Sequence, residues 1–398
     1  MGLRIGICGT GAFADCFIPL FKAHPEVGQV VLCDLDAGKL QAKATQHGLS
    51  TTCPSLDELC QTEVDAIAIF SQNWKHGPQA VQALRAGKHV YSAVPSAISM
   101  DEIRDLVHTV EATGRTYMVG ETSYYYPTAI YCRERFRKGD FGPIVYAEGE
   151  YYHDFDHGLY EVMKWRGGAD WKRFAGGPPM YYPTHSTSMI IGVTGARMTQ
   201  VSCLGWVDRH EDGLFRTDTN IWHNEFSNET ALFRMSDGSM VRINEFRRNG
   251  HVGGERLNLY GTKASFEEQY LHKTWVDKHA GGCADLTELL SCAGVPATAA
   301  GGLSGLPAAD AVHHGVSKVH PVERLPRQFV GLGNGHCGSH QFLVDDFVMA
   351  CVSGRTPPNN VWAAARYLVP GLIAHESALR GGLQLAVPDL GEPPGQGR

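Results

Sequence analysis

The chain has 398 residues, of which 43% are hydrophobic and 19% are charged, and its formal net charge is −7. This length accommodates two domains with sizeable cores, and the composition is ordinary for a globular protein. The negative charge argues against nucleic acid or an anionic membrane surface as the main partner. No apolar run is long enough to span a bilayer and no signal-peptide pattern opens the chain, so we expect a cytoplasmic protein. The eleven cysteines lack paired close spacing, which favours reduced thiols over disulfides or a zinc site.

The first strand pattern, at residues 3–8, is followed by a glycine-rich turn. Gly9, Gly11 and Ala14 have the spacing G-x-G-x-x-A, and a helical segment follows. Gly9 allows a tight turn, Gly11 lets the backbone approach a pyrophosphate, and Ala14 permits close packing of the helix on the strand. This spacing predicts a dinucleotide-binding turn.

The second strand pattern, at residues 30–33, ends at Asp34. An acidic residue about 20 positions after the glycines can accept hydrogen bonds from the ribose hydroxyls of a dinucleotide. A carboxylate there also repels a 2′-phosphate, and no arginine follows directly. The pattern therefore predicts NAD rather than NADP as the cofactor.

Strand and helix patterns continue to alternate along the first third of the chain. Strands are expected at 64–70, 88–92 and 116–120, and helices at 78–86 and 100–113. This order predicts an α/β fold with a doubly wound parallel sheet, a Rossmann domain. Ligands bind at the carboxyl edge of such a sheet. That edge supplies four further candidates for cofactor binding, which are Asn73, His76, Pro95 and Glu121.

The middle third contains four segments whose side chains alternate with period two. They are residues 144–151, 200–206, 228–235 and 239–246, and Ser-Asp-Gly at 236–238 forms a hairpin turn between the last two. These segments predict a second, α+β domain with a large open and mostly antiparallel sheet. One face of that sheet is then left for a substrate or for a second copy of the chain.

A Gly/Pro-rich segment at residues 176–185 carries Tyr182 and His185, three positions apart. Two glycines and three prolines predict a rigid loop, and the tyrosine and histidine on it are candidates for a proton-transfer pair. The alternative is structural, with Tyr182 packed and His185 capping a helix. Aromatic residues throughout this domain suit the apolar faces of a sugar ring, although each of them can equally belong to the core.

The region from residue 272 to 335 shows no persistent periodicity. We interpret it as a surface excursion, and a lid over the site is one use for it. His313, His314 and His320 lie in it without the spacing of a known metal motif, so we predict no metal. Helical patterns return at 342–353 and 361–379. The expected domains are 1–124 for NAD binding, 125–334 for substrate and oligomerisation with an insertion at about 271–333, and 335–398 for C-terminal helices that pack on the first domain.

The glycine fingerprint, the loop at Pro95 and the segment around His185 together resemble the Gfo/Idh/MocA superfamily, which joins a Rossmann domain to an open-sheet substrate domain. Dehydrogenases of that superfamily generally carry Glu-Lys-Pro where this chain has Ala93-Val94-Pro95, and the lysine serves in catalysis. They also carry an aspartate at the position of Tyr181.

Both departures are similar to one subgroup, the NAD-dependent glycoside hydrolases of the α-N-acetylgalactosaminidase type. That subgroup has a Val-Pro-Ala-Ala-like loop and a Tyr-Pro-Thr-His motif, and further similar segments lie at 148–154, 260–263, 335–338 and 387–389. The resemblance implies catalytic roles for Tyr182 and His185, with Tyr152 and His153 as neighbours. It also implies His336 as a cofactor contact, a small sugar or glycoside as substrate, and a homo-oligomer formed through the open sheet.

The reaction implied by the resemblance returns NAD to its starting state. A ring carbinol is oxidised, a base removes the acidified proton on the neighbouring carbon, the aglycone is eliminated, water adds, and the hydride is returned. No oxocarbenium ion forms, so the paired carboxylates of ordinary glycosidases are unnecessary. Two alternatives stay open, which are a net NAD-dependent sugar dehydrogenase and a non-catalytic NAD-bound sensor.

Overall fold

The computed structural model describes residues 2–297 and 311–394. The chain divides into two compact units. The first contains Met1–Ile130, Leu289–Ala365 and Leu390–Arg398, and the second contains Tyr131–Glu288 and Arg366–Asp389. Helices α7 (Pro127–Arg137) and α12 (Val361–Leu379) each begin in the first unit and continue in the second.

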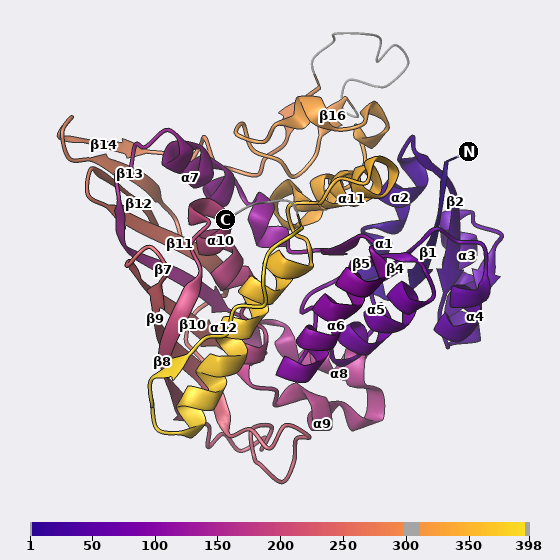
Figure 1. Ribbon diagram of the computed structural model, residues 1–398, viewed down its shortest axis with the longest axis horizontal. Helices are drawn as coiled ribbons and strands as arrows, with labels where there is room; N and C mark the ends of the chain where they lie inside the picture. The colour runs from indigo at the N-terminus through magenta and orange to yellow at the C-terminus, as the bar shows by residue number, and fades with distance from the viewer. Residues whose placement is uncertain (1, 298–310, 395–398) are drawn as a thin grey trace. The chain divides into compact units, whose positions relative to one another are not determined.

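The first unit is built on a six-stranded sheet with the order β3-β2-β1-β4-β5-β6, and all of its strands are parallel (Figure 1). The strands are β1 (Leu3–Cys8), β2 (Val27–Cys33), β3 (Thr52–Cys53), β4 (Ala66–Ile69), β5 (His89–Ser92) and β6 (Tyr117–Val119). The helices are α1 (Ala12–Asp15), α2 (Ile18–Ala23), α3 (Ala37–His47), α4 (Leu56–Gln61), α5 (His76–Arg85), α6 (Met100–Thr113) and α11 (Gly335–Ser353).

Side chains cover both faces of this sheet. Ile5 and Ile7 of β1 point into a core shared with Phe17 and with residues of α11. Gly6, between them, faces the other way, and a side chain there would meet Leu59 of α4 at 2.8 Å. Because both faces are buried, the strands are apolar over most of their length, as is usual for parallel sheets. The prediction of a Rossmann-like α/β unit is confirmed.

The second unit contains a nine-stranded sheet with the order β14-β13-β12-β11-β7-β10-β9-β8-β17. Its strands are β7 (Ile144–Tyr152), β8 (Met198–Val207), β9 (Phe226–Met235), β10 (Met240–Phe246), β11 (Gly254–Gly261), β12 (Ala264–Glu268), β13 (Lys273–Asp277), β14 (Gly282–Asp285) and β17 (Leu385–Ala386). Strands β7 and β10 are parallel and every other neighbouring pair is antiparallel. The predicted open, mostly antiparallel sheet is confirmed.

Helix α10 (Thr184–Thr194) packs directly on β7 of this sheet. A side chain at Gly149 would lie 2.5 Å from the carbonyl oxygen of Ser186, so glycine is required for the helix to approach so closely. Since side chains alternate along β7, Gly149 and Tyr151 face α10 whereas Glu150 and Tyr152 face away from it. This alternation decides which candidate residues can meet.

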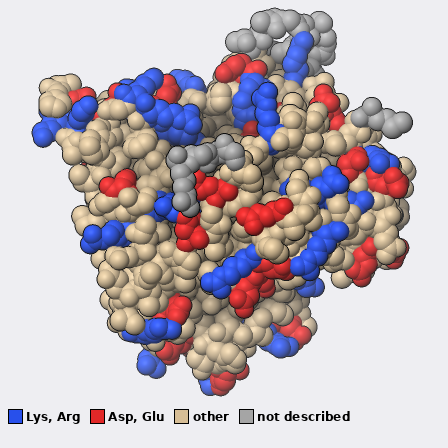
Figure 2. All heavy atoms as spheres, viewed as in Figure 1, with Lys and Arg blue, Asp and Glu red and all other residues tan. Residues whose placement is uncertain are grey.

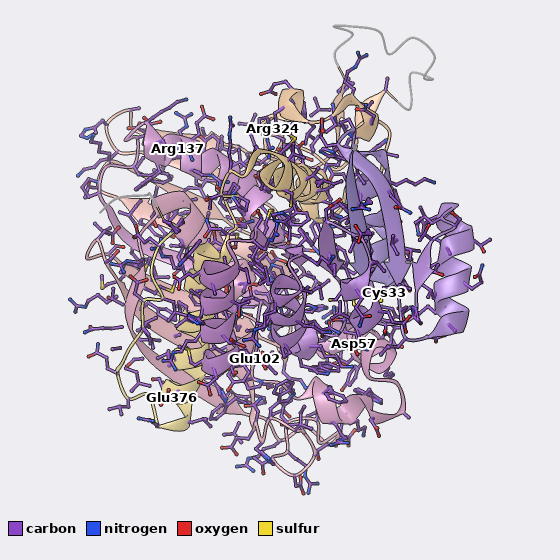
Figure 3. All side chains as sticks on the ribbon, turned by 45° about the vertical axis from the view of Figure 1, so that its right-hand side comes forward. Cys33, Asp57, Glu102, Arg137, Arg324 and Glu376 are labelled. Atoms are coloured by element: carbon purple, nitrogen blue, oxygen red, sulfur yellow. The ribbon has the colours of Figure 1, made fainter. Side chains whose placement is uncertain are left out.

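The interpretation of residues 272–335 as a surface excursion is wrong in two parts of the described chain. Residues 273–285 form β13 and β14, which extend the large sheet. Further along, Val316, Leu325 and Phe329 are buried in the core of the first unit. Arg324, labelled in Figure 3, pairs with Asp345 at 2.8 Å and Asp346 at 2.9 Å, both on α11. Buried apolar residues that occur singly produce no periodicity, which explains the error. Residues 298–310 lie outside the described residues.

All eleven cysteines are free in this structure, and Cys16, Cys283 and Cys337 are exposed. Within the described ranges, no helix combines the length and the apolar character needed to cross a bilayer. Lysine and arginine side chains are interspersed with acidic ones on the face shown in Figure 2.

Candidate functional site

The turn after β1 has the geometry that the glycine spacing predicts. Gly9 has φ +89°, which an L-amino acid rarely adopts, and a side chain on it would lie 2.8 Å from the backbone of Phe70. Gly11 follows as the N-cap of α1 and Ala14 is fully buried. Glycine at position 9 is therefore required on two independent grounds.

Asp34 lies directly after β2, and its carboxylate accepts four hydrogen bonds. Oδ2 accepts from the backbone N–H and the hydroxyl of Thr10, each at 2.8 Å, and from Nζ of Lys39 at 2.9 Å. Oδ1 accepts from the N–H of Asp36 at 3.1 Å. Burial opposes ionisation, but these hydrogen bonds outweigh it and lower the pKa of Asp34, so the group is a carboxylate at neutral pH.

The other predicted cofactor residues of this sheet lie on the loops at its carboxyl edge. Asn73 begins η1 (Asn73–Lys75) after β4, and His76 begins α5. The ring nitrogens of His76 lie 2.9 Å from the carbonyl oxygen of Pro95 and 3.1 Å from that of Ser71, so the imidazole joins the loops after β4 and β5. Glu121, after β6, is fully buried and accepts from the N–H of Ser123 at 2.9 Å.

His336 lies at the start of α11, where the backbone of residues 336–338 is left-handed. Its Nδ1 is 2.8 Å from Nε2 of His340, and its ring contacts Phe13 of α1 with centroids 5.6 Å apart. Burial, and then His336, lowers the pKa of His340 to about 3, so His340 is neutral. Sequence reasoning missed His340, because the left-handed backbone at 336–338 and not regular helical spacing brings the two rings together.

In the second unit, Tyr182 and His185 come together, but not on one loop. Tyr182 follows η5 (Pro179–Tyr181), whereas His185 lies in the first turn of α10 and is 5% exposed. The prediction of a loop for both residues is therefore wrong for His185, because the helix starts right after Pro183. The two rings lie with centroids 5.3 Å apart, and each also contacts Tyr151, at 6.1 Å from Tyr182 and 5.2 Å from His185.

Tyr151 also joins His153 to this cluster. The Tyr151 hydroxyl lies 2.7 Å from Nδ1 of His153. Burial, followed by Tyr182, raises the pKa of Tyr151 well above 10, and burial, followed by Arg247, lowers the pKa of His153 to about 4. At neutral pH the tyrosine is therefore the donor and the neutral imidazole is the acceptor.

Two carboxylates flank Tyr151 on the neighbouring strands. Glu255 of β11 and Glu245 of β10 are both its register partners, so all three side chains lie on the same face of the sheet. Oε2 of Glu255 is 4.0 Å from Nδ1 of His185. Glu245 is fully buried, accepts from the hydroxyl of Ser186 and pairs with Arg247 at 3.1 Å.

Burial raises the pKa of Glu245 to about 8, against the opposing effect of Arg247. Sequence reasoning counted Tyr151 only among the aromatic residues that suit a sugar ring, and it missed Glu245, Glu255 and Arg247, because register between distant strands brings these to Tyr151.

The structure does not bring Tyr152 to this cluster. It lies on the other face of the sheet, stacked on Phe246 with centroids 5.0 Å apart and with the Arg256 guanidinium 5.1 Å above its ring. Its hydroxyl accepts from Nδ2 of Asn244 at 3.4 Å. A one-residue step along a strand changes the face, and this step separates Tyr152 from Tyr151.

The segment that carries Tyr182 is fixed by a buried glutamate that also contacts a histidine of α12. Glu229 is fully buried and accepts from the N–H of Met180 at 2.8 Å and from Nδ1 of His375, on α12, at 2.8 Å. A side chain at Gly371 would lie 2.8 Å from Cβ of Pro183 and closer still to the carbonyl oxygen of Met180. Helix α12 thus fixes this segment at two points within the second unit.

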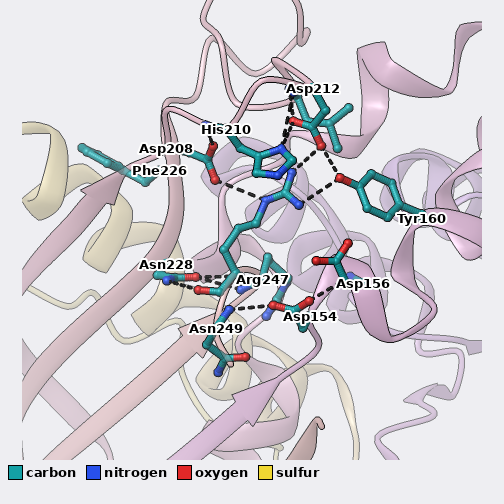
Figure 4. A network of polar contacts seen from close by, with 12 residues as sticks. Asp154, Asp156, Tyr160, Asp208, His210, Asp212, Phe226, Asn228, Arg247 and Asn249 are labelled. Carbon is teal, nitrogen blue, oxygen red and sulfur yellow. Dashed lines mark hydrogen bonds and ion pairs between the residues drawn. The ribbon is translucent and has the colours of Figure 1, made fainter. Parts of the chain in front are cut away.

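A second polar network fixes the segments that follow β7 and β8 (Figure 4). The guanidinium of Arg248 binds Asp212 and the hydroxyl of Tyr160, the latter at 2.9 Å, and lies 3.4 Å from Asp208. Asp154 accepts from the N–H of Asn249 at 2.6 Å. Asp154 directly follows His153, so the network also determines where that histidine lies.

Comparison with known proteins agrees with this geometry. The model of the Gfo/Idh/MocA family, described as an oxidoreductase family with an NAD-binding Rossmann fold, matches residues 3–121. These residues belong to the Gfo/Idh/MocA family. For this part of the chain the predicted superfamily and its NAD-binding fold are thereby confirmed, as is the coarse assignment to an NAD-dependent oxidoreductase family of enzymes.

Relatives with similar sequences are named as glycosyl hydrolase family 109 proteins. One from Saccharopolyspora erythraea is 25% identical over 72% of this chain and 68% of its own length. One from Solibacter usitatus is 25% identical over 98% and 88%, and one from Bacteroides fragilis is 31% identical, but only over 41% and 38%.

Solved structures of dehydrogenases have the same fold. A levoglucosan dehydrogenase in complex with NADH and levoglucosan aligns with a TM-score of 0.75, 16% identity and coverage of 98% of this chain and 100% of that chain. A myo-inositol 2-dehydrogenase from Lactobacillus plantarum aligns with a TM-score of 0.70, 20% identity and the same coverage. At these identities the likeness concerns the fold alone.

The residues of the first unit fit a dinucleotide. The turn at Gly9 accepts only glycine, and the backbone of such a turn can approach a pyrophosphate. The ionised carboxylate of Asp34 at the end of β2 can accept hydrogen bonds from the ribose hydroxyls.

Proposed function

We propose that this chain is an NAD-dependent glycoside hydrolase. The observation that carries the proposal is a cluster of four side chains. Tyr182 and His185, which can transfer protons, lie with their rings in contact, and beside them the hydroxyl of Tyr151 is hydrogen-bonded to the neutral imidazole of His153. The names of the sequence relatives support the same class of substrate.

Bound NAD would supply the reversible oxidation of a ring carbinol, and the second unit would supply the proton transfers. His185 is the candidate to accept the proton of that carbinol hydroxyl. The Glu255 carboxylate, 4.0 Å from its Nδ1, can orient the imidazole and stabilise the positive charge that the proton brings. Tyr182 is the candidate for the proton on the neighbouring carbon, whose removal allows the aglycone to leave.

Tyr151 and His153 have a different part in this proposal. Because the pKa of Tyr151 is raised, its hydroxyl stays protonated, and because its one proton is donated to His153 at 2.7 Å, its oxygen is a fixed acceptor. An acceptor that does not ionise can hold a sugar hydroxyl in place without removing its proton. Tyr152, on the opposite face, is not part of this set.

A net sugar dehydrogenase is the competing function, and the dehydrogenase fold makes it a specific alternative. Such enzymes generally use the lysine that is Val94 here. Purified protein mixed with a panel of nitrophenyl glycosides separates the functions. Nitrophenol without net NADH supports the hydrolase, NADH without nitrophenol supports the dehydrogenase, and neither product with NAD bound supports the non-catalytic sensor.

We also propose that two copies associate through the face of the large sheet that α10 does not cover. Four apolar side chains on adjacent strands β8, β9 and β10 are exposed there: Leu204 by 66%, Trp206 by 55%, Leu232 by 57% and Met240 by 58%. Patches of this kind mark interaction sites. Leu232→Lys should shift the mass measured by light scattering to that of a single chain, and an unchanged oligomer would exclude this face.

A further inference from the structure

Three glutamates lie in one row across the large sheet, on the face that α10 covers. Glu229 of β9 is the register partner of Glu245 on β10. Tyr151 of β7 is the register partner of both Glu245 and Glu255, which is on β11. Glu229 and Glu245 are fully buried, and the Glu255 side chain is 12% exposed. Neighbouring strands lie about 5 Å apart, so negative charges on both Glu229 and Glu245 would repel each other in a buried layer.

The three glutamates differ in their basic partners. Oε1 of Glu229 is 2.8 Å from Nδ1 of His375, and Oε2 of Glu255 is 4.0 Å from Nδ1 of His185. Glu245 instead meets Arg247 at one contact of 3.1 Å. The same guanidinium also donates to three backbone carbonyl oxygens, at 3.2–3.5 Å. Arg247 is thus shared with neutral acceptors and compensates a charge on Glu245 incompletely.

The hydrogen bonds of Ser186 show where a proton is needed. Its Oγ contacts Oε1 of Glu245 and lies 2.9 Å from the carbonyl oxygen of Pro183. A hydroxyl has one hydrogen, so it donates fully to only one of these two oxygens. If Glu245 is protonated, its O–H donates to Ser186, and the hydroxyl of Ser186 donates to Pro183. Both contacts are then hydrogen bonds, and Oε2 of Glu245 still accepts from Arg247 at 3.1 Å.

We infer that Glu245 is a neutral carboxylic acid in the working protein, and that it is a positioning residue which leaves His185 able to accept a proton. His185 directly precedes Ser186 in the first turn of α10. A negative charge on Glu245 would hold a proton on the imidazole, whereas a neutral acid fixes the start of the helix through Ser186 without adding charge. The inference rests on the proposed role of His185 in proton transfer.

The surroundings of Glu245 agree with a neutral acid. Within the described residues, the ionisable groups that face it are Arg247 of its own strand, Glu229 of β9, Tyr151 of β7 and His185 of α10. Burial raises the pKa of Glu245 to about 8, against the opposing effects of Arg247, Ser186 and His185. The acid therefore keeps its proton at neutral pH and loses it in mildly alkaline solution.

Infrared difference spectroscopy of the NAD-loaded protein tests the protonation directly and needs no substrate. The spectrum of the native protein minus that of Glu245→Gln should contain the carbonyl band of a protonated acid at neutral pH. Carboxylate bands should replace it as the pH rises past about 8. Carboxylate bands at neutral pH would overturn the inference, whether or not the protein cleaves glycosides.

The pH dependence of kcat/KM tests the effect on His185, and it can be followed through nitrophenol or through NADH. Its acid limb reports the base of the free enzyme, which is His185 in the proposal. Glu245→Gln keeps an uncharged group in place, so the midpoint of this limb should not move. Glu255→Gln is the matched comparison, because it removes a carboxylate 4.0 Å from Nδ1 of His185 and should lower the midpoint by about one pH unit or more. A similar downward shift in Glu245→Gln would overturn the inference.

Two further variants separate positioning from folding, and circular dichroism establishes that each variant is folded. Glu245→Leu removes both hydrogen bonds and should lower kcat/KM more than Glu245→Gln does, and equal losses would overturn the positioning role. If Glu245→Gln does not fold, Ser186→Ala replaces it in the infrared experiment. The acid then loses its acceptor, so its carbonyl band should move to higher frequency, and an unchanged band would contradict the inference.

Discussion

Gly371→Ala tests how α12 holds the segment that carries Tyr182. The new methyl group would lie 2.8 Å from Cβ of Pro183 and still closer to the carbonyl oxygen of Met180, where 3.4–4 Å is ordinary contact. Either α12 or the segment must then move by about 1 Å, and overpacking of this kind typically costs about 1–3 kcal/mol. A displacement of that size at a reacting group lowers turnover by about 10²-fold.

Urea unfolding would give the stability of this variant, and nitrophenol release would give its turnover. NAD affinity should stay unchanged, because Gly371 belongs to the second unit. Gly250→Ala is the matched control, since no atom lies within 4 Å of the added methyl group. A Gly371→Ala protein that matches Gly250→Ala in both stability and turnover would refute the reasoning.

Three further substitutions test separate parts of the second unit. His185→Asn should keep the fold and NAD binding while turnover falls by about 10²–10⁴-fold, and a fall below tenfold would exclude proton transfer by this residue. Burial raises the pKa of Glu245 from 4.5 to about 8, so the folded protein holds this proton more tightly than the unfolded chain does. The associated stability is present below pH 4.5 and is lost as the pH rises to about 8.

Glu245→Gln removes this titration, so its stability relative to the native protein should rise by a few kcal/mol between pH 4.5 and pH 8 in urea unfolding, and a pH-independent difference would contradict the shift. Arg248→Met leaves Asp208 and Asp212 without their partner and should cost about 3 kcal/mol. Exposed Arg216, paired with Asp218, gives the control Arg216→Met, which should change stability little.

The sequence predicts the first unit well because local signals and fold agree there. The strand at residues 3–8 and the helix at 100–113 occur with those bounds, since a short, mostly apolar segment defines the first and an amphipathic pattern with a glycine stop defines the second. Strand β3 has only two residues, Thr52–Cys53, too few for any period to show. Strand β14 was missed for another reason, because all four of its residues are exposed and the pattern that reveals a strand is absent.

The candidate site was predictable only where its residues are neighbours in the chain. Tyr182 and His185 lie within one short segment, so a motif reveals them. Glu245 and Glu255 meet Tyr151 through the register of β10 and β11 against β7, which no local pattern encodes. The same cause separates Tyr152, because adjacent residues of a strand point to opposite faces and only the packing of α10 shows which face is used.

The central proposal is cleavage of a glycoside through a transient ketone, and one isotope experiment tests it most directly. The substrate is a nitrophenyl glycoside deuterated at the carbon next to the carbinol that is oxidised, and the released sugar is analysed by mass spectrometry. In the proposed reaction a base removes that deuteron, and water later supplies a proton in its place. The released sugar should therefore have lost the label, with no net NADH formed. Nitrophenol release with the label fully retained in the sugar would contradict the proposed reaction.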